Sequence, residues 1–375
     1  MAATELRNER ATRVDIEGFF ARDVMAFTRA LAELDSQIAP DAEARADDRF
    51  RSLTQAIRLS LDACRRIESE MGHDRARILE TQKRFQQVIS PWFDRSWFMH
   101  RAKTKPRGYP GDYELLAAIY DGAPKSRGLG GYLDLYFLNT ELGRAVPARL
   151  KAAKNFLIEE IARRRGDVSI LNVACGPCRE YEGGIADRQR SSVHVTCIDN
   201  DQQALDYVRA RILTVSGIPD VHCACYNALR MRSAGATIRR FGRPDIIYSV
   251  GLCDYLPDKA LVGMLRGWRD SLNDGGVLYV AFKDSRRYDK TPYQWHVDWY
   301  FFQRTAEQCR RLYEQAGFDP ERLEMSRDET GVIINFISRL APQRIIRVDV
   351  LDPVAGAEPT PAASALAREA SQGVS

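Results

Sequence analysis

The sequence lacks long apolar runs, and its charge is nearly balanced. No stretch of its 375 residues approaches about 18 uninterrupted apolar residues, so we expect no membrane span. The N-terminal segment carries charges of both signs and has no apolar core before a small-residue cleavage site, which predicts a cytoplasmic location. Lys and Arg outnumber Asp and Glu by 55 to 51, an excess too small to mark a dedicated nucleic-acid-binding protein.

The eight cysteines are scattered and lack the pattern of a disulfide framework. Five of them lie in or beside apolar runs that look like buried strands: Cys175, Cys178, Cys197, Cys223 and Cys225. In a chain of this length we expect them to be reduced, packed thiols. Their CxxC and CxC spacings have no histidine close in sequence to complete a tetrahedral ligand set, so we expect no metal.

What is present is the composition of a globular protein, with 45% hydrophobic residues and a length that predicts about two to three domains. Over residues 15–99 apolar residues recur at intervals of three and four, with almost no glycine. This period predicts two long helices and then a third over residues 75–90, interrupted at Pro91. We expect a helical N-terminal domain, with a loop that covers the site, over residues 1–135.

Residues 103–131 form a loop region in which proline and glycine are interleaved with charged and aromatic residues, beginning KTKPRGYPGDYELL. Loops of this kind often carry function. Residues 101–166 contain 13 basic and 7 acidic residues, which predicts a local basic face suited to an acidic substrate. A helix over about residues 139–165 leads into the next module.

From residue 168 short apolar runs alternate with helical segments, which predicts a doubly wound, mostly parallel α/β sheet. Helices are expected after the first turn and over residues 201–213, 259–272 and 299–316. Strands near residues 321–325 and 332–340 are separated by a short loop, so we expect an antiparallel pair at a sheet edge. We assign residues 136–341 to this domain and residues 342–375, rich in Ala, Pro, Ser and Gly near their end, to a disordered tail.

One strand of this domain ends in a turn of small residues, within the segment ILNVACGPC at residues 170–178. A tight strand-to-helix connection needs small residues whatever its function, but the next strand ends in Asp199, 23 residues beyond Gly176. A carboxylate at that position can accept both hydroxyls of a ribose. The pairing predicts a nucleoside-containing cofactor without separating a dinucleotide from S-adenosylmethionine.

These segments resemble the class I S-adenosylmethionine-dependent methyltransferases over about residues 168–340. The matching pieces, in order, are ILNVACGPC, VTCIDND, CYNAL, DIIYSVGLCDYL and SLNDGGVLYVAF. The resemblance implies a Rossmann-like seven-stranded sheet with an antiparallel edge strand, and S-adenosylmethionine as the cofactor. It places cofactor contacts at Asn172, Ala174, Cys175, Gly176, Pro177, Glu180, Asp199, Asn200, Asn227, Ala228, Ser249, Gly251 and Asp254.

The first of these motifs departs from the family in three places. Asn172 stands where the family commonly has an acidic residue, and Ala174 and Cys178 stand where it has glycine. Glu180 or Asp254 can supply the missing contact to the ammonium group of the cofactor, although either is equally expected as a solvated surface carboxylate.

A narrower resemblance rests on KPRGYPGDYELL followed by ILNVACGPCRE. This combination is similar to bacterial proteins that make 3-hydroxy fatty acid methyl esters, signals of the extracellular-factor type. It implies a transferase of small-molecule biosynthesis that methylates a carboxylic acid such as a hydroxy fatty acid. A carboxylate is a nucleophile at neutral pH and needs no strong base, whereas an alcohol or amine needs its proton removed.

Two other functions stay open. The fold can serve different S-adenosylmethionine chemistry, at another sulfonium carbon or by cyclisation that releases methylthioadenosine, or it can belong to a non-catalytic cofactor-binding protein. We expect a small-molecule acid as the partner, no nucleic acid, and a monomer or homodimer.

Aromatic and charged residues of the loop and of a segment near residue 295 are candidates for acceptor chemistry. Tyrosine and tryptophan faces can stabilise a sulfonium, an arginine can pair with a carboxylate, and a histidine can act as a base. The predicted catalytic residues are Tyr109, Tyr113 and His296, and the predicted substrate-binding residues are Arg107, Tyr132, Tyr293, Trp299 and Tyr300. For each aromatic residue the alternative is packing of the helical domain against the sheet, and for His296 it is a structural, hydrogen-bonded role.

Overall fold

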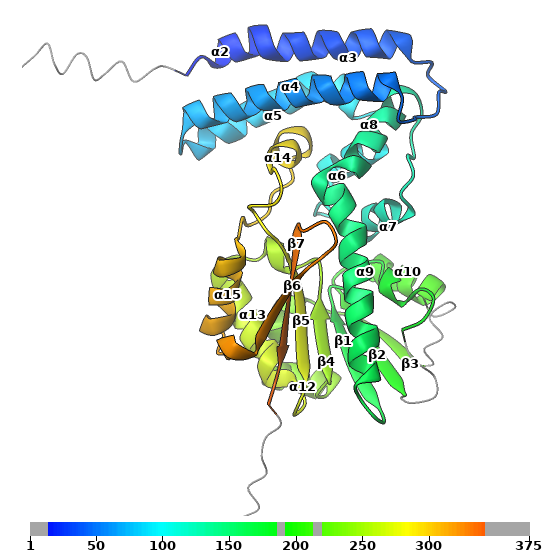
Figure 1. Cartoon of the computed structure of the whole chain (residues 1–375), viewed down its shortest axis with the longest axis vertical. Helices are drawn as coiled ribbons and strands as arrows, with labels where there is room; N and C mark the ends of the chain where they lie inside the picture. The colour runs from blue at the N-terminus through cyan, green and yellow to red at the C-terminus, as the bar shows by residue number, and fades with distance from the viewer. Residues whose placement is uncertain (1–13, 186–191, 213–219, 342–375) are drawn as a thin grey trace, which may run out of the picture. The chain divides into compact units, whose positions relative to one another are not determined.

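A mixed seven-stranded sheet forms the C-terminal part of the computed structural model, which describes residues 14–185, 192–212 and 220–341 (Figure 1). Its strands are β1 (Val168–Val173), β2 (Val193–Asp199), β3 (Asp220–Cys225), β4 (Ile246–Ser249), β5 (Val277–Lys283), β6 (Leu323–Arg327) and β7 (Ile333–Arg339). Their order is β3-β2-β1-β4-β5-β7-β6. Neighbouring strands are parallel except around β7, which is antiparallel to both β5 and β6.

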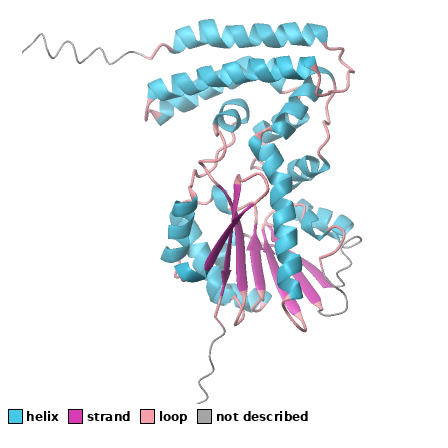
Figure 2. Ribbon diagram, viewed as in Figure 1, coloured by secondary structure: helices cyan, strands magenta, loops and turns pink. Residues whose placement is uncertain are grey.

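Helices cover both faces of this sheet (Figure 2). On one face α9 (Glu141–Ala162) packs on the strands, with the rings of Phe156 and Tyr279 stacked 4.5 Å apart. On the other face lie α13 (Asp258–Ser271) and α15 (Ala306–Gln315), which bury Trp268 and Tyr313. Further helices are α10 (Gln202–Tyr207) and α12 (Ala234–Phe241). The predicted Rossmann-like fold with an antiparallel strand at one edge is therefore confirmed.

The N-terminal region is helical, as predicted. Its helices are α2 (Ile16–Phe19), continuing through a π-helical turn into α3 (Met25–Gln37), then α4 (Asp48–Met71), α5 (Arg75–Phe93), α6 (Trp97–Thr104), α7 (Tyr113–Asp121) and α8 (Gly128–Asn139). The predicted interruption at Pro91 is wrong, because α5 continues to Phe93. Pro91 has no N–H to donate to the carbonyl of Gln87, four residues earlier in the helix. The hydroxyl of Ser90 donates to that carbonyl instead.

Two further helix predictions are wrong. The helix expected from residue 299 begins at Ala306, because Thr305 forms a capping box with Gln308. Residues 298–304, here called the cap segment, are irregular, and α14 (Thr291–Val297) precedes them. After β1 the described residues contain a single 3-10 turn, Arg179–Tyr181, in place of the expected helix.

Helix α14 joins the sheet to the N-terminal helices by packing on α4, α5 and α6 (Figure 1). The indole N–H of Trp295 donates to Glu68 on α4 (2.8 Å), which also pairs with Lys290 (2.7 Å). The described residues through Ala341 belong to one compact unit, and the boundary near residue 135 stays a prediction. The tail at residues 342–375 lies outside the described residues. Among the described helices none has the length and apolar character needed to cross a membrane.

Candidate cofactor and acceptor site

The turn after β1 has the backbone of a glycine turn although only one of its three key positions is glycine. Ala174, Gly176 and Cys178 have φ angles of +57°, +53° and +53°, in the left-handed region. This conformation costs a residue with a Cβ roughly 1 kcal/mol. The amide of Cys175 donates to the carbonyl of Ile198 (3.0 Å), which ties the turn to the end of β2. Ala174 and Cys178 therefore adopt a backbone conformation that glycine favours.

Asp199 faces this turn from the end of β2. Its carboxylate accepts hydrogen bonds from the amides of Gly176 and Asp201, both at 2.9 Å, and its side chain is oriented by them. The residue is 8% exposed, and burial raises its pKa although the backbone donors oppose the rise. The remaining lone pairs can accept ribose hydroxyls. One carboxylate oxygen of Asp201 is also buried, without a partner among the described residues.

The loop at residues 105–112, here called the cover loop, lies against the same strand end. The guanidinium of Arg107 is 3.3 Å from Asp201 and 5.3 Å from the centre of the Tyr113 ring, which in turn packs on Tyr207. Burial, and then the charges of Asp199 and Asp201, raise the pKa of Tyr109, so its hydroxyl stays protonated. Arg107 is thus engaged with Asp201, and the structure does not place it in the acceptor cavity described below.

The departure at Asn172 is explained by Glu180. The amide of Asn172 donates to the Glu180 carboxylate (3.0 Å), and the hydroxyl of Tyr248 donates to the same oxygen (2.5 Å). Burial raises the pKa of Glu180. An acidic residue at position 172 would bring two buried carboxylates together, which is unfavourable. Glu180 is therefore held by this internal network.

Asp254, the other candidate for the ammonium contact, is paired with a residue that the sequence analysis missed. Its carboxylate lies 2.6 Å from the Lys283 ammonium, and both side chains are buried. Burial lowers the pKa of Lys283, and the charge of Arg149 adds to this, while Asp254 opposes it. The available signal was a lysine directly after the apolar strand VLYVAF.

Arg149 is a second missed residue, and it lacks a carboxylate partner among the described residues. It is 3% exposed, and its Nε has no hydrogen-bond partner. Its guanidinium contacts the hydroxyl of Tyr120, and its terminal nitrogens lie 3.8 and 4.0 Å from the point where a Cβ on Gly251 would stand. Its place among the buried apolar positions of α9 was the signal that could have revealed it.

Arg149 and Lys283 line a cavity of about 40 Å³, here called the inner cavity, at the end of β4. Three predicted site residues, Gly251, Tyr293 and Trp299, line it as well. The remaining lining residues are Gly111, Leu116, Phe137, Leu142, Gly143, Val146, Tyr255 and Phe301. The lining includes two cations, and it has no histidine and no carboxylate residue.

The cover loop and the cap segment close over this cavity. The indole N–H of Trp299 donates to the hydroxyl of Tyr255 (2.9 Å), which donates to the carbonyl of Pro110 (3.3 Å). Gly111 has a φ of +76°, and a Cβ there would lie 2.7 Å from the Trp299 ring. Lys105 and Asp298 form an ion pair at 2.5 Å. Only a residue without a side chain fits at position 111 in this arrangement.

Three of the other predicted residues lie outside the inner cavity. Tyr132 donates to Asp47, the N-cap of α4, at 2.7 Å, and Tyr300 donates to Gln82 on α5 at 2.6 Å. His296 is 2% exposed, with its ring 4.8 Å from that of Phe93, and burial lowers its pKa to about 3. A group with such a pKa is a weak base, so we do not carry the catalytic expectation for His296 forward.

The other predicted cofactor residues gather at the carboxyl ends of the strands. The hydroxyl of Ser249 donates to the carbonyl of Val173 (2.9 Å), and Asn227 caps the 3-10 turn that begins at Ala228. Asn200 is exposed after β2, and Pro177 is buried in the first turn. Their cofactor contacts stay predictions. Within the described residues, no group of three or more His, Cys, Asp or Glu side chains is arranged to hold a metal ion.

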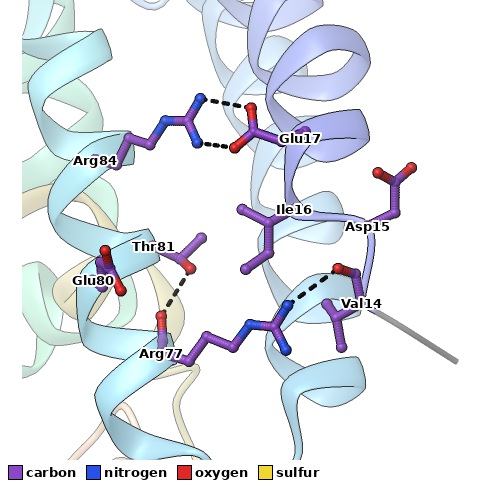
Figure 3. Close-up of a pocket in the computed structure, with 8 residues that line it drawn as sticks. All are labelled: Val14, Asp15, Ile16, Glu17, Arg77, Glu80, Thr81 and Arg84. Carbon is purple, nitrogen blue, oxygen red and sulfur yellow. Dashed lines mark hydrogen bonds and ion pairs between the residues drawn. The ribbon is translucent and has the colours of Figure 1, made fainter. Parts of the chain in front are cut away.

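A cavity of about 610 Å³ between the start of α2 and α5 has a different character (Figure 3). Arg84 pairs with Glu17 at 2.5 Å, and Arg77 donates to the carbonyl of Val14 at 3.3 Å. None of its lining residues belongs to the sheet, the cover loop or the cap segment. We therefore assign it no part in the site.

No protein-family model matches this chain, and no curated protein matches it either. A solved structure of a possible exported protein from Bordetella parapertussis is similar over 87% of this chain and 97% of its own, with 16% identity and a TM-score of 0.51. Magnesium protoporphyrin IX methyltransferase from Synechocystis, with bound S-adenosylmethionine, matches 53% of this chain and 84% of its own, with 9% identity and a TM-score of 0.39. N-methyltransferase NodS from Bradyrhizobium japonicum, with bound S-adenosylhomocysteine, matches 61% and 97%, with 13% identity and a TM-score of 0.37. At such identities the likeness concerns the fold.

Proposed function

We propose that this chain is an enzyme that binds S-adenosylmethionine at the carboxyl ends of β1, β2 and β4. The left-handed turn after β1 and the oriented carboxylate of Asp199 suit a nucleoside, because they offer a close backbone approach and free acceptor lone pairs. The protonated hydroxyl of Tyr109 lies at the same strand end and adds a hydrogen-bond donor. When bound, the cofactor supplies an electrophilic methyl group on a sulfonium.

We further propose that the methyl acceptor is the carboxylate of a small acid, such as a hydroxy fatty acid. The observation that carries this proposal is the buried guanidinium of Arg149, which faces the inner cavity without a carboxylate partner among the described residues. A buried cation is strongly destabilising unless an anion pairs with it. A substrate carboxylate satisfies Arg149 and brings its own nucleophilic oxygen into the cavity.

The lining of the inner cavity suits such an acceptor. A carboxylate needs no base, and the lining contains neither histidine nor a carboxylate residue. The Trp299, Tyr255 and Pro110 hydrogen bonds hold the cover closed and exclude water, which aligns the nucleophile and strengthens the ion pair. Arg149 then acts as a binding and orienting group.

The test is to incubate the purified protein with S-adenosylmethionine and a panel of acids, amines and alcohols, and to identify the products by mass spectrometry. We expect S-adenosylhomocysteine and a methyl ester only when an acid is present. Methylthioadenosine would indicate other sulfonium chemistry, and tight cofactor binding without turnover would indicate a non-catalytic binding protein. Either result would overturn the proposal.

A matched pair of variants on α9 tests the role of Arg149. Arg149→Gln should lower kcat/KM for the acid by roughly 30-fold to 5,000-fold, the usual cost of truncating one partner of a buried charge pair. Arg144→Gln, at an exposed position of the same helix, should leave it unchanged. The affinity for S-adenosylhomocysteine, measured by calorimetry, should be similar in all three proteins. A loss of that affinity in Arg149→Gln would assign Arg149 to the carboxylate of the cofactor instead.

A further inference from the structure

The inner cavity is too small to hold a whole acceptor. Its volume of about 40 Å³ leaves room for about three or four water molecules, at roughly 10–15 Å³ each. Only the reacting end of an acid can enter it, so the remainder of the molecule needs a second space that adjoins the first. The described residues line such a space.

A second pocket, here called the outer pocket, has a volume of about 420 Å³, within the range of roughly 300–1,000 Å³ for small-molecule sites. Tyr255 and Phe301 line both the inner cavity and the outer pocket. Their ring centres are 5.4 Å apart, so this pair of rings forms the partition between the two spaces. The other walls come from α4, α5, α14 and the cap segment, parts of the chain that are distant in sequence (Figure 1).

The chemistry of the outer pocket suits an uncharged chain. Ile78, Leu79 and Phe302 supply apolar walls, and Phe302 is 46% exposed although it is a large apolar residue. Gln82, which is 1% exposed, accepts a hydrogen bond from the hydroxyl of Tyr300 at 2.6 Å. These side chains offer apolar contact together with amide and hydroxyl groups, which suits an alkyl chain that carries a hydroxyl group.

The charged residues that line the outer pocket do not favour a charged ligand. Glu68 pairs with Lys290 at 2.7 Å and accepts the indole N–H of Trp295 at 2.8 Å. Arg75, the other charged residue that lines the pocket, is exposed at the start of α5, so water solvates its charge. A charged group on the ligand therefore gains little in the outer pocket. Arg149, a buried cation that has no carboxylate partner among the described residues, lies on the other side of the ring pair.

We propose that the outer pocket binds the alkyl chain of the acid acceptor, and that α4 and α5 thereby set which acids are accepted. This assignment rests on the proposed function. When the acid binds, Tyr255 keeps its hydrogen bonds to Trp299 and Pro110, and the Phe301 ring moves away from it. The carboxylate then reaches Arg149 while the chain stays against Leu79 and Phe302. The N-terminal helices are then a specificity element for the acceptor.

The test is the dependence of kcat/KM on chain length, measured with a homologous series of straight-chain and hydroxylated acids. In the wild-type protein each methylene that enters the outer pocket should raise kcat/KM about fourfold, until the pocket is full. Leu79→Trp should shift the optimum to shorter acids and lower kcat/KM for the longest acids by more than about tenfold. Leu79→Ala, which enlarges the same space, should shift the optimum in the opposite direction.

The control is Lys83→Trp, at an exposed position of α5 that does not line the pocket, which should leave the profile unchanged. The affinity for S-adenosylhomocysteine and the thermal midpoint verify that each variant is folded. An unchanged chain-length profile in both folded Leu79 variants, with acid methylation intact, would overturn the pocket assignment alone. Failure of the wild-type protein to methylate any acid would overturn the proposed function and this assignment with it.

Discussion

Replacing Arg149 by methionine should make the protein more stable while removing its ability to methylate acids. The guanidinium is buried, its Nε lacks a partner, and no carboxylate of the described residues pairs with it. The unbound protein therefore carries the desolvation cost of this charge without the compensation of an ion pair. Methionine fills much of the same volume without a charge.

The size of the effect follows from two opposing contributions. Replacing buried charged groups with apolar side chains of similar volume can stabilise a protein by about 1–4 kcal/mol. Loss of the contact with the Tyr120 hydroxyl offsets about 1 kcal/mol of this gain. We expect a net gain of up to about 3 kcal/mol, or a rise of up to roughly 4 °C in the thermal midpoint for a chain of this size.

The matched control is Arg304→Met, because Arg304 is also buried but has a full set of partners. It pairs with Asp258 at 2.7 Å and donates to the carbonyls of Cys253 and Leu256. Its loss leaves those carbonyls without a donor and should destabilise the protein by about 2–4 kcal/mol. Thermal unfolding and urea titration of both variants measure the contrast.

The reasoning would be refuted if Arg149→Met destabilised the protein as much as Arg304→Met. That result would mean that Arg149 is a structural residue whose charge is compensated in the unbound protein. Retention of acid methylation by a stable Arg149→Met variant would equally remove it from the acceptor site.

Three other substitutions test the turn, the cover and the core. Ala174→Gly should remove the backbone strain of a left-handed φ of +57° and raise the free energy of unfolding by about 1 kcal/mol in urea titrations, with unchanged cofactor affinity. A less stable variant would show that Ala174 is not strained. Gly111→Ala places a Cβ 2.7 Å from the Trp299 ring and should raise KM for the acid. The control Gly108→Ala, at a similar φ of +82° but in open space, should leave KM unchanged, and equal effects of the two variants would argue against the close contact. His296→Phe should make stability less dependent on acid. Because burial lowers the pKa of His296 to about 3 from 6.5, the unfolded chain alone takes up this proton as the pH falls below 6.5, and the wild-type protein loses stability until about pH 3. The loss reaches about 2 kcal/mol at pH 5 and should be absent in the variant; parallel pH profiles of the two proteins would refute the shift.

The sequence by itself determined the alternation of strands and helices, the turn at Gly176 and the position of Asp199. These follow from local periodicity and from the rule that ligands bind at the carboxyl ends of parallel strands, neither of which needs a tertiary contact. Local reasoning failed at Pro91 and at the start of α15. At Pro91 the Ser90 hydroxyl donates to a backbone carbonyl, and before α15 the Thr305 side chain accepts from a backbone amide. The hydrophobic period does not reveal such hydrogen bonds between side chains and the backbone.

Only the tertiary structure decided which charged residues face the acceptor cavity. Arg149 and Lys283 come from α9 and from the end of β5, and Trp299 reaches the cavity from the cap segment. Whether a buried charge has a partner depends on groups distant in sequence, so Arg107, prominent in its loop, is paired with Asp201 while Arg149 has no such pair. The electrostatic character of this site therefore arises from packing between elements and not from any one motif.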